Sequence, residues 1–532
     1  MMQGKKKLEP KLLYTVTIDQ LVPKNNFYRR LNETLDLRWL YGATKNYYGT
    51  EGQESIDPVV FFKLCLVGYV NGITSDRKLE EFCSDSLSVR LFLGYDIDES
   101  LPWHSTISRT RQLYGEEIFR KLFNDIVKAC IDKGMVSGHS QAIDGALLKA
   151  NASMDSIEAK EVTATVEEHL KDCLKTNNRP QRKAKQNRAP EEQQKMDGDE
   201  GQQQKQLEEL NTRYERQKEK YKGMPGTTEG KYLSNKTHYS PVDPDARIAV
   251  KPGKPRLLYY NGQLAVDTDR HVITHAEATH ADGRDGKDLQ QVVMATKELL
   301  QEEGLVIENI LADAGYSSGE NYHFLEEQNL TGYIPVLGGA LMGSEGFTYD
   351  KENDYYICPN NKILKGSGRV VDDGRGHPVR KYFSLKSDCA VCPLKEKCLG
   401  KKTPYKKIQH SIYLEETERA RRRQLSSRGL FMKRKRSATV EPVWGTLINY
   451  LGLRKLNARG LAQVNKIVLM SATVYNLKKL MKFTGKKTNT KIIALKGELP
   501  AFVNAMTFYF ITSKWRKVFY SENSIHFGSC FA

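Results

Sequence analysis

Two apolar runs, one around an aspartate and one that ends just before an aspartate, indicate the expected fold class. Residues 140–152 form a short apolar run around Asp144, which is the pattern of a buried strand. Residues 306–312 form a second apolar run, which leads into Asp313. Between these runs, the pattern predicts two further strands and one amphipathic helix, over residues 257–266, 271–278 and 286–302. This order predicts an α/β fold with a mixed sheet flanked by helices, in which functional groups gather at strand ends.

The chain before this sheet, residues 1–138, is expected to form an all-α domain. Residues 57–70 are almost continuously apolar, and an aspartate and a proline stand where a helix would begin. Residues 101–113 predict a turn and a short basic helix that carries Arg109 and Arg111. Helix–turn–helix proteins that bind DNA show this pattern, and so does any surface helix with two arginines.

A long polar insert, residues 154–225, follows the strand with Asp144. Apolar side chains recur at helical spacing near both ends of this insert and are almost absent from its centre, which predicts a helical hairpin with an exposed tip. The other expected segments are an α/β core over 139–153 and 226–345, a cysteine-containing region over 346–400, a basic segment with helices that complete the core over 401–485, and a C-terminal tail without an assigned role over 486–532.

Three acidic residues are candidates for one metal site. Asp144 and Asp313 lie in or directly after apolar strands, where a carboxylate is costly unless it is paired or bound to a cation. Glu441 is the third candidate, because Thr439 can cap a helix there and Pro442 is tolerated in a first turn. Carboxylate oxygens suit Mg²⁺ or Mn²⁺, and two such ions can activate water or a 3′-hydroxyl against a phosphodiester. Each acid taken alone is better explained as a turn or cap residue.

Four cysteines are candidates for a second metal site. Cys389 and Cys392 form a C-x₂-C pair, Cys398 follows them, and Cys358 lies upstream. This set fits a tetrahedral structural Zn²⁺ site, although a zinc ribbon would prefer two C-x₂-C pairs. Reduced thiols without metal are the alternative. A redox pair is less favoured, because no thioredoxin-like pattern surrounds these cysteines.

The charge balance points to a polyanionic partner. The chain has 82 Lys and Arg against 65 Asp and Glu, a net charge of +17. Residues 419–436 contain nine basic side chains and no acidic one, and directly precede Glu441, so we expect them to bring phosphates to the carboxylates. The candidates for DNA contacts in this run are Arg421, Arg422, Arg423, Lys433, Arg434, Lys435 and Arg436. A nuclear-import signal is the rival explanation for the last four.

Several classes of protein are not expected. The first eleven residues are polar and basic, without the apolar stretch of a secretory signal. The longest apolar stretch, residues 58–70, is interrupted by Lys63 and is too short to span a bilayer. Nine cysteines, an odd number, argue against a disulfide framework. We therefore expect a cytoplasmic protein without a membrane partner.

The order of these motifs along the chain resembles that of the DDE transposases of bacterial insertion sequences. Residues 55–82 and 101–111 are similar to the N-terminal domain of many of these enzymes, and residues 243–267 to the strands after the insert. DGALLKANA at 144–152 resembles the first catalytic strand, LADAGYSS at 311–318 the motif of the second aspartate, and VEPVWGTLI at 440–448 the glutamate helix. Many relatives also carry a cysteine cluster between the second aspartate and the glutamate.

The resemblance implies an RNase H-like fold in which Asp144, Asp313 and Glu441 bind Mg²⁺ or Mn²⁺. The implied activity is cleavage at transposon ends and transfer of the 3′-hydroxyl into double-stranded target DNA, by a homodimer or larger assembly on DNA at the nucleoid. Relatives usually have an arginine four residues before the glutamate and a lysine seven after it, where this chain has Ser437 and Ile448. Two alternatives therefore stay open: a domesticated or decayed transposase that binds DNA without cleaving it, and a nuclease without strand transfer.

Overall fold

The computed structural model describes residues 16–49, 55–159, 234–235, 238–251, 253, 255–283, 285–337, 346–372, 378–400 and 403–483. Almost all of the predicted helical-hairpin insert and the whole predicted C-terminal tail lie outside these residues. The chain divides into two compact units, Met1–Lys482 and Phe483–Ala532, and everything below concerns the first of them.

The N-terminal part is helical, as predicted. Its central helix α4 (Pro58–Val70) begins with the expected proline, and the Asp57 carboxylate accepts hydrogen bonds from the backbone N–H groups of Val59 and Val60. The helix is buried on most sides, which agrees with its nearly continuous apolar sequence. Around it in the chain are α1 (Ile18–Leu21), α2 (Phe27–Thr34), α3 (Trp39–Thr44), α5 (Asp76–Asp85), α6 (Leu87–Leu93), α7 (His104–Leu113) and α8 (Glu116–Asp132).

The main sheet is mixed. Its antiparallel part joins β1 (Ser140–Lys149) to β5 (Leu257–Asp267), and β5 also pairs with β4 (Arg247–Ala249) and β6 (Ile273–His280). On its other side β1 runs parallel to β7 (Asn309–Leu311), which runs parallel to β8 (Thr331–Tyr333).

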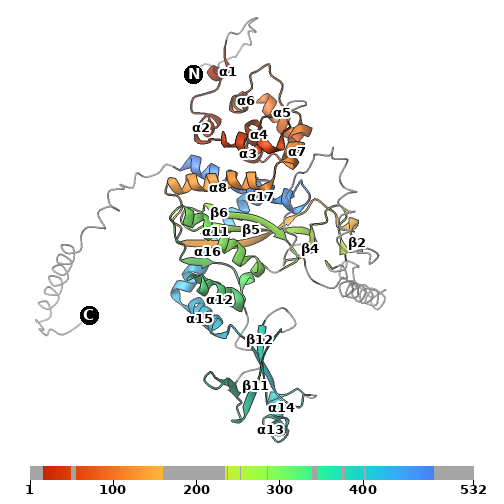
Figure 1. Cartoon of the computed structure of the whole chain (residues 1–532), viewed down its shortest axis with the longest axis vertical. Coiled ribbons are helices and arrows are strands. Elements are labelled where there is room, and N and C mark those ends of the chain that lie inside the picture. The colour runs from red at the N-terminus through yellow and green to blue at the C-terminus, as the bar shows by residue number, and fades with distance from the viewer. Residues whose placement is uncertain are drawn as a thin grey trace, which may run out of the picture. The chain divides into compact units, whose positions relative to one another are not determined.

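Helices connect the strands on the parallel side of this sheet (Figure 1). The helix α11 (Leu289–Glu302) leads from β6 to β7, and α12 (Gly319–Glu327) leads from β7 to β8. Three antiparallel strands followed by two parallel ones, with a helix before each parallel strand, is the RNase H-like arrangement. The predicted α/β fold class is therefore confirmed.

Two long helices complete the core. The helix α16 (Ser427–Tyr450) contacts β1, β5, β7 and β8, and α17 (Leu461–Lys482) contacts β6, α8 and α4. Because α17 touches both the sheet and the N-terminal helices, one hydrophobic core runs through both parts. The N-terminal helices are thus packed onto the sheet through α17.

A second sheet lies in the chain between β8 and α15 (Leu414–Leu425) (Figure 1). All its neighbouring strands are antiparallel, in the order β13 (Lys407–Ser411), β12 (Pro378–Phe383), β11 (Ile363–Asp372), β10 (Tyr355–Ile357) and β9 (Thr348–Asp350). Two short helices, α13 (Lys386–Ala390) and α14 (Lys395–Cys398), stand between β12 and β13. We call residues 346–411 the cysteine module, because the sheet of the predicted cysteine-containing region continues to Ser411.

None of the helices in the described parts of the chain is long and apolar enough to cross a membrane.

Candidate active site

Asp144 lies in β1, and Asp313 follows the end of the neighbouring strand β7. In the parallel pairing of β1 with β7, Ala142 lies opposite Leu311. Asp144 stands two residues further along β1, and Asp313 follows the end of β7 by two residues, at the start of a short 3₁₀ turn. The negative charge of Asp313 acts on the Asp144 carboxylate, so the two side chains lie near each other. The two predicted aspartates are therefore brought together.

The carboxylate of Asp144 is only 18% exposed. Burial raises the pKa of Asp144 to about 6; the positive charge of Arg436 opposes this rise, and the negative charge of Asp313 adds to it. Asp144 therefore lies in a setting that favours a nearby cation, because an isolated buried carboxylate is costly.

Asp313 is held by a tight turn at the end of β7. Its Oδ1 accepts a hydrogen bond of 2.8 Å from the backbone N–H of Gly315. The next residue, Tyr316, is buried and its hydroxyl donates to the Gln263 side chain on β5. Ser318 then caps α12 by accepting a hydrogen bond from the N–H of Asn321. The loop that carries the second carboxylate is therefore fixed at both ends.

The prediction that a helix begins just before Glu441 is wrong. Glu441 lies in the middle of α16, which starts at Ser427 and whose N-terminus is capped by Ser426. The Thr439 hydroxyl does not cap this helix and instead donates to the Lys435 carbonyl, one turn earlier. Pro442 has no N–H group, so the carbonyl of Ala438, four residues earlier, loses its helical hydrogen bond. Pro442 is tolerated inside α16 because Ala438 is exposed.

Packing of α16 on the sheet sets the position of Glu441. The buried face of this helix near Glu441 consists of Val440, Val443, Trp444 and Leu447. The Glu441 side chain itself is 61% exposed, at the edge of this packed face. It lies on the helix that covers β1 and β7, the strands of the two aspartates.

Arg436 connects two of the three carboxylates. Its Nη1 lies 3.7 Å from Oδ1 of Asp144, and its Nη2 lies 3.6 Å from Oε1 of Glu441. The Arg436 side chain is only 14% exposed. We predicted this arginine as a DNA contact, and the structure gives it a different position, between the acidic side chains. The length of α16 was not predicted from the sequence. Because this helix already starts at Ser427, Arg436 and Glu441 lie on the same helix, five residues apart.

The three carboxylates provide the oxygen donors that Mg²⁺ and Mn²⁺ prefer. In their present positions, however, no three Asp, Glu, His or Cys side chains among the described residues are close enough together to hold a metal ion. The positive charge between Asp144 and Glu441 is supplied by Arg436. A divalent ion there would need the arginine to move and the carboxylates to draw closer.

Besides Arg436, two more of the predicted DNA-binding arginines are engaged in ion pairs. Arg111 makes two hydrogen bonds with the carboxylate of Asp76, at 2.9 and 2.7 Å, and both side chains are about four-fifths buried. Arg423 lies 3.4 Å from Glu326 of α12. We therefore leave Arg111 and Arg423 out of the proposed DNA contacts.

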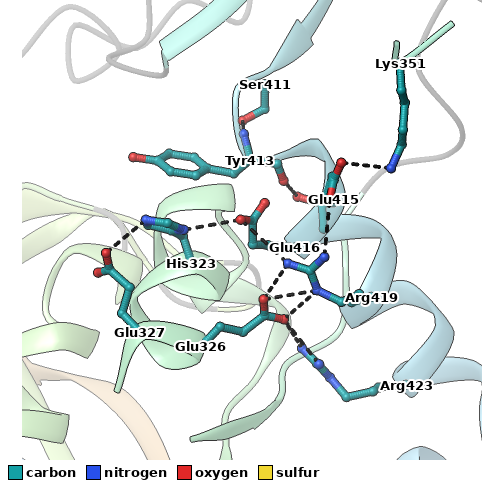
Figure 2. Close-up of polar contacts among 11 residues, drawn as sticks. His323, Glu326, Glu327, Lys351, Ser411, Tyr413, Glu415, Glu416, Arg419 and Arg423 are labelled. Atoms are coloured by element: carbon teal, nitrogen blue, oxygen red, sulfur yellow. Dashed lines mark hydrogen bonds and ion pairs between the residues drawn. The ribbon is translucent and has the colours of Figure 1, made fainter. Parts of the chain in front are cut away.

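Figure 2 shows the group of charged side chains that joins α12 to α15. Glu326 lies at its centre, where its carboxylate accepts hydrogen bonds from Arg419, at 2.6 Å, and from Arg423. His323 lies between Glu327, at 3.2 Å, and Glu416, at 3.3 Å. Part of the basic run thus holds α12 and α15 together, and only its remaining side chains are available to bind a phosphate.

Of the predicted DNA contacts, the side chains that stay exposed are those of Arg109 on α7, Arg422 on α15, and Lys433 and Arg434 on α16. Lys435 is half-buried on α16, and Arg421 is half-buried and engaged by other groups. Lys433 and Arg434 precede Glu441 on α16 by eight and seven residues, which is about two turns of the helix. Phosphates bound there would be close to the carboxylates.

The four predicted cysteine ligands line one cavity in the cysteine module. Cys358 follows β10, Cys389 lies in α13, Cys392 follows that helix, and Cys398 ends α14. All four are free thiols and half-buried. Burial raises the pKa of the Cys398 thiol, and the other three thiols act on it in the same direction, which agrees with their common location.

Two family models match the chain. Residues 16–113 match a model described as a transposase domain, and residues 357–481 match one described as a transposase DDE domain. The first match covers α1 to α7, and the second covers most of the cysteine module with α15, α16 and α17, including Glu441. None of the curated proteins compared with the chain matches it. The predicted resemblance to DDE transposases of insertion sequences is thereby confirmed.

Proposed function

From the two transposase domains that the chain carries, we infer that it is a DDE transposase that cuts phosphodiesters at the ends of its element and joins the resulting 3′-hydroxyls to target DNA. One observation carries the chemical part of this proposal. Asp144 on β1 lies near enough to Asp313, just after the neighbouring strand β7, for their charges to interact, and Arg436 links Asp144 to Glu441.

In this proposal, Asp144, Asp313 and Glu441 hold two divalent cations, Mg²⁺ or Mn²⁺. Such ions supply Lewis-acid stabilisation of a phosphodiester under attack by water or by a 3′-hydroxyl. The chain contributes carboxylates held by a central strand, a fixed turn and a packed helix. Arg436 balances the carboxylate charges, and its guanidinium is suited to a bidentate contact with a phosphate once it is released.

We assign the DNA backbone contacts to Arg109, Arg422, Lys433, Arg434 and Lys435. Each phosphate that such a side chain neutralises releases counterions, so binding should weaken steeply with added salt. Because two element ends must be cut and joined together, we propose at least a homodimer on DNA.

A second candidate function is DNA binding without cleavage. Relatives have a lysine where this chain has Ile448, and Ile448 packs against the main hydrophobic core. An apolar side chain there cannot contact a phosphate. A decayed transposase would keep the exposed cations and lose the reaction, and a nuclease without strand transfer would keep only its first step.

The test uses the purified full-length chain and a labelled duplex that contains one end of its element. We compare the wild type with Asp144→Asn, Asp313→Asn and Glu441→Gln, in Mg²⁺, Mn²⁺ and EDTA, on denaturing gels. The proposal expects nicks at the element boundary that need a divalent ion, a loss of at least about a hundredfold in each variant, and unchanged DNA binding.

Asp98→Asn is the matched control, because Asp98 is an exposed aspartate away from the site. Cleavage that persists in the Asp313→Asn variant would overturn the assignment of the three carboxylates. DNA binding without any nick in the wild type would favour the second candidate. Nicks that never yield joined products would favour the nuclease.

A further inference from the structure

We propose that the cysteine module binds one Zn²⁺ through Cys358, Cys389, Cys392 and Cys398, and that this ion holds α13 and α14 onto the second sheet. The site is structural and separate from the proposed catalytic carboxylates. Its existence can be tested by metal content alone, whatever the outcome of the cleavage assay.

The first argument is convergence. The four cysteines come from the β10–β11 turn, from α13 and the turn after it, and from the end of α14, and all four line the same cavity. The other described cysteines, Cys65, Cys83 and Cys130, are buried singly in the helical part. Four thiols directed at one space, with none of them in a disulfide, make the ligand set of a tetrahedral zinc site.

The second argument concerns the groups around the sulfur atoms. The backbone N–H of Lys362 donates to Sγ of Cys358 at 3.3 Å, in a turn where Asn361 has a positive φ of 53°. The side-chain amide of Asn360 donates to Sγ of Cys392 at 3.6 Å. Donors aimed at sulfur stabilise the thiolate form, which is the form that binds metal.

The third argument is that little apolar burial fixes the helices of the module among its described residues. Its separate core contains only four fully buried apolar side chains, those of Tyr356, Leu364, Tyr382 and Ile408. The helices α13 and α14 have five and four residues and no buried residue. Helices this short are not stable alone, and small cores usually need a metal or a disulfide.

Binding requires a small closure of the loops that carry the cysteines. No three ligating side chains in the described parts of the chain have metal-binding spacing as they stand. Neither α13 nor α14 has a buried residue that such a movement would expose. When Zn²⁺ binds, each coordinating thiol loses its proton to solvent, and no oxidation or reduction is involved.

The experiment measures zinc in the full-length protein, purified under reducing conditions without chelator. We expect about one Zn²⁺ per chain, and an absorption spectrum typical of tetrahedral thiolate coordination when Co²⁺ replaces it. Cys389→Ser and Cys392→Ser should each lower zinc content at least severalfold. Cys130→Ala is the matched control, because it removes a buried thiol outside the module and should leave zinc content unchanged.

Amide hydrogen exchange gives a second readout on the wild type, which does not depend on whether a variant folds. Removal of zinc with a chelator should speed exchange in residues 378–400 by about tenfold or more, and leave α16 and α17 protected, since their core is separate. The proposal is overturned if the reduced wild type binds no Zn²⁺ or Co²⁺, if the two serine variants keep full zinc content, or if the cysteines are found in disulfides.

Discussion

The guanidinium of Arg436 lies 3.7 Å from the carboxylate of Asp144, and both side chains are more than four-fifths buried. Arg436 comes from the middle of α16 and Asp144 from the central strand β1, so their contact joins the helix to the sheet. The same guanidinium lies 3.6 Å from Glu441. A buried cation between two carboxylates offsets their repulsion, and a divalent ion would have the same effect.

Replacing Arg436 by glutamine should therefore make stability depend more strongly on metal. In EDTA, we expect the Arg436→Gln variant to lose about 3 kcal/mol of stability, because one buried partner of Asp144 is removed. Added Mg²⁺ should raise the melting temperature of the variant more than that of the wild type, since the ion then supplies the missing charge. Thermal unfolding in EDTA and in Mg²⁺ measures both quantities.

Arg428→Gln provides the control for this comparison. Arg428 is an exposed arginine of the same helix, and it contacts the Tyr333 hydroxyl instead of a carboxylate. It should show the wild-type response to Mg²⁺. Equal responses in the wild type and Arg436→Gln would mean that the arginine and the metal do not share a site.

A glycine on β5 controls how closely α16 approaches the sheet. A Cβ atom on Gly262 would lie 2.8 Å from Cη2 of Trp444 and 3.0 Å from Cδ1 of Leu148. Gly262→Val should therefore push α16 outward and destabilise the protein by about 1–3 kcal/mol. Because Trp444 is on the same helix as Glu441, DNA cleavage should fall as well. Chemical denaturation and the cleavage assay measure the two effects.

Gly445→Ala is the companion variant, with the opposite expectation. An added Cβ on Gly445 would meet nothing within 4 Å, and this glycine lies inside α16. Alanine should stabilise the helix by up to about 1 kcal/mol and leave cleavage intact. If both glycine variants had the same effect on stability, close packing at Gly262 would not be the cause.

If the ion pairs between α12 and α15 are broken, we expect lower stability and higher affinity for DNA. Glu326→Gln should cost about 1 kcal/mol or less, because the pairs with Arg419 and Arg423 are partly exposed. It should also release Arg423 and remove one of the three acidic partners of Arg419, which strengthens DNA binding and steepens its dependence on salt. Glu327→Gln changes the net charge equally but affects only His323. Equal DNA affinity in the two variants would show that the arginines do not reach DNA.

The parts of the fold with a strong local pattern could be predicted from the sequence. The capped helix α4, the strands around Asp144 and the cap at Ser318 each follow from side-chain periodicity and the residue types at element ends. The proximity of Asp144 and Asp313 follows from the fold class, since β1 and β7 are parallel neighbours in one sheet.

The parts that depend on distant contacts could not be predicted. The basic run hides the periodicity of α16, so its true start at Ser427 and the position of Arg436 depend on packing against the sheet. Arg111 looked like a surface cation, and only the approach of α5 supplies its partner Asp76. Sequence shows which side chains are charged, whereas tertiary contacts decide which charges remain available.

A buried lysine predicts a distinct pH dependence of stability. Lys466 on α17 is 3% exposed, its Nζ donates to the Arg111 carbonyl at 3.0 Å, and burial lowers its pKa from 10.5 to about 8. Between these two pH values the unfolded chain holds the lysine proton and the folded chain does not. Lys466 therefore destabilises the fold most below about pH 8, and this cost disappears as the pH rises toward 10.5, at about 1.4 kcal/mol for each unit.

Lys466→Met should remove this dependence while keeping the volume of the side chain. The variant should gain most stability relative to the wild type at neutral pH, and the gain should shrink steadily between about pH 8 and pH 10. Thermal unfolding of both proteins across this range isolates the lysine, because all other groups titrate in both. For Lys133→Met, at an exposed lysine, the curve of stability against pH should run parallel to that of the wild type. Parallel curves for Lys466→Met as well would mean that the buried ammonium keeps its proton throughout, held by the Arg111 carbonyl and the Phe119 ring.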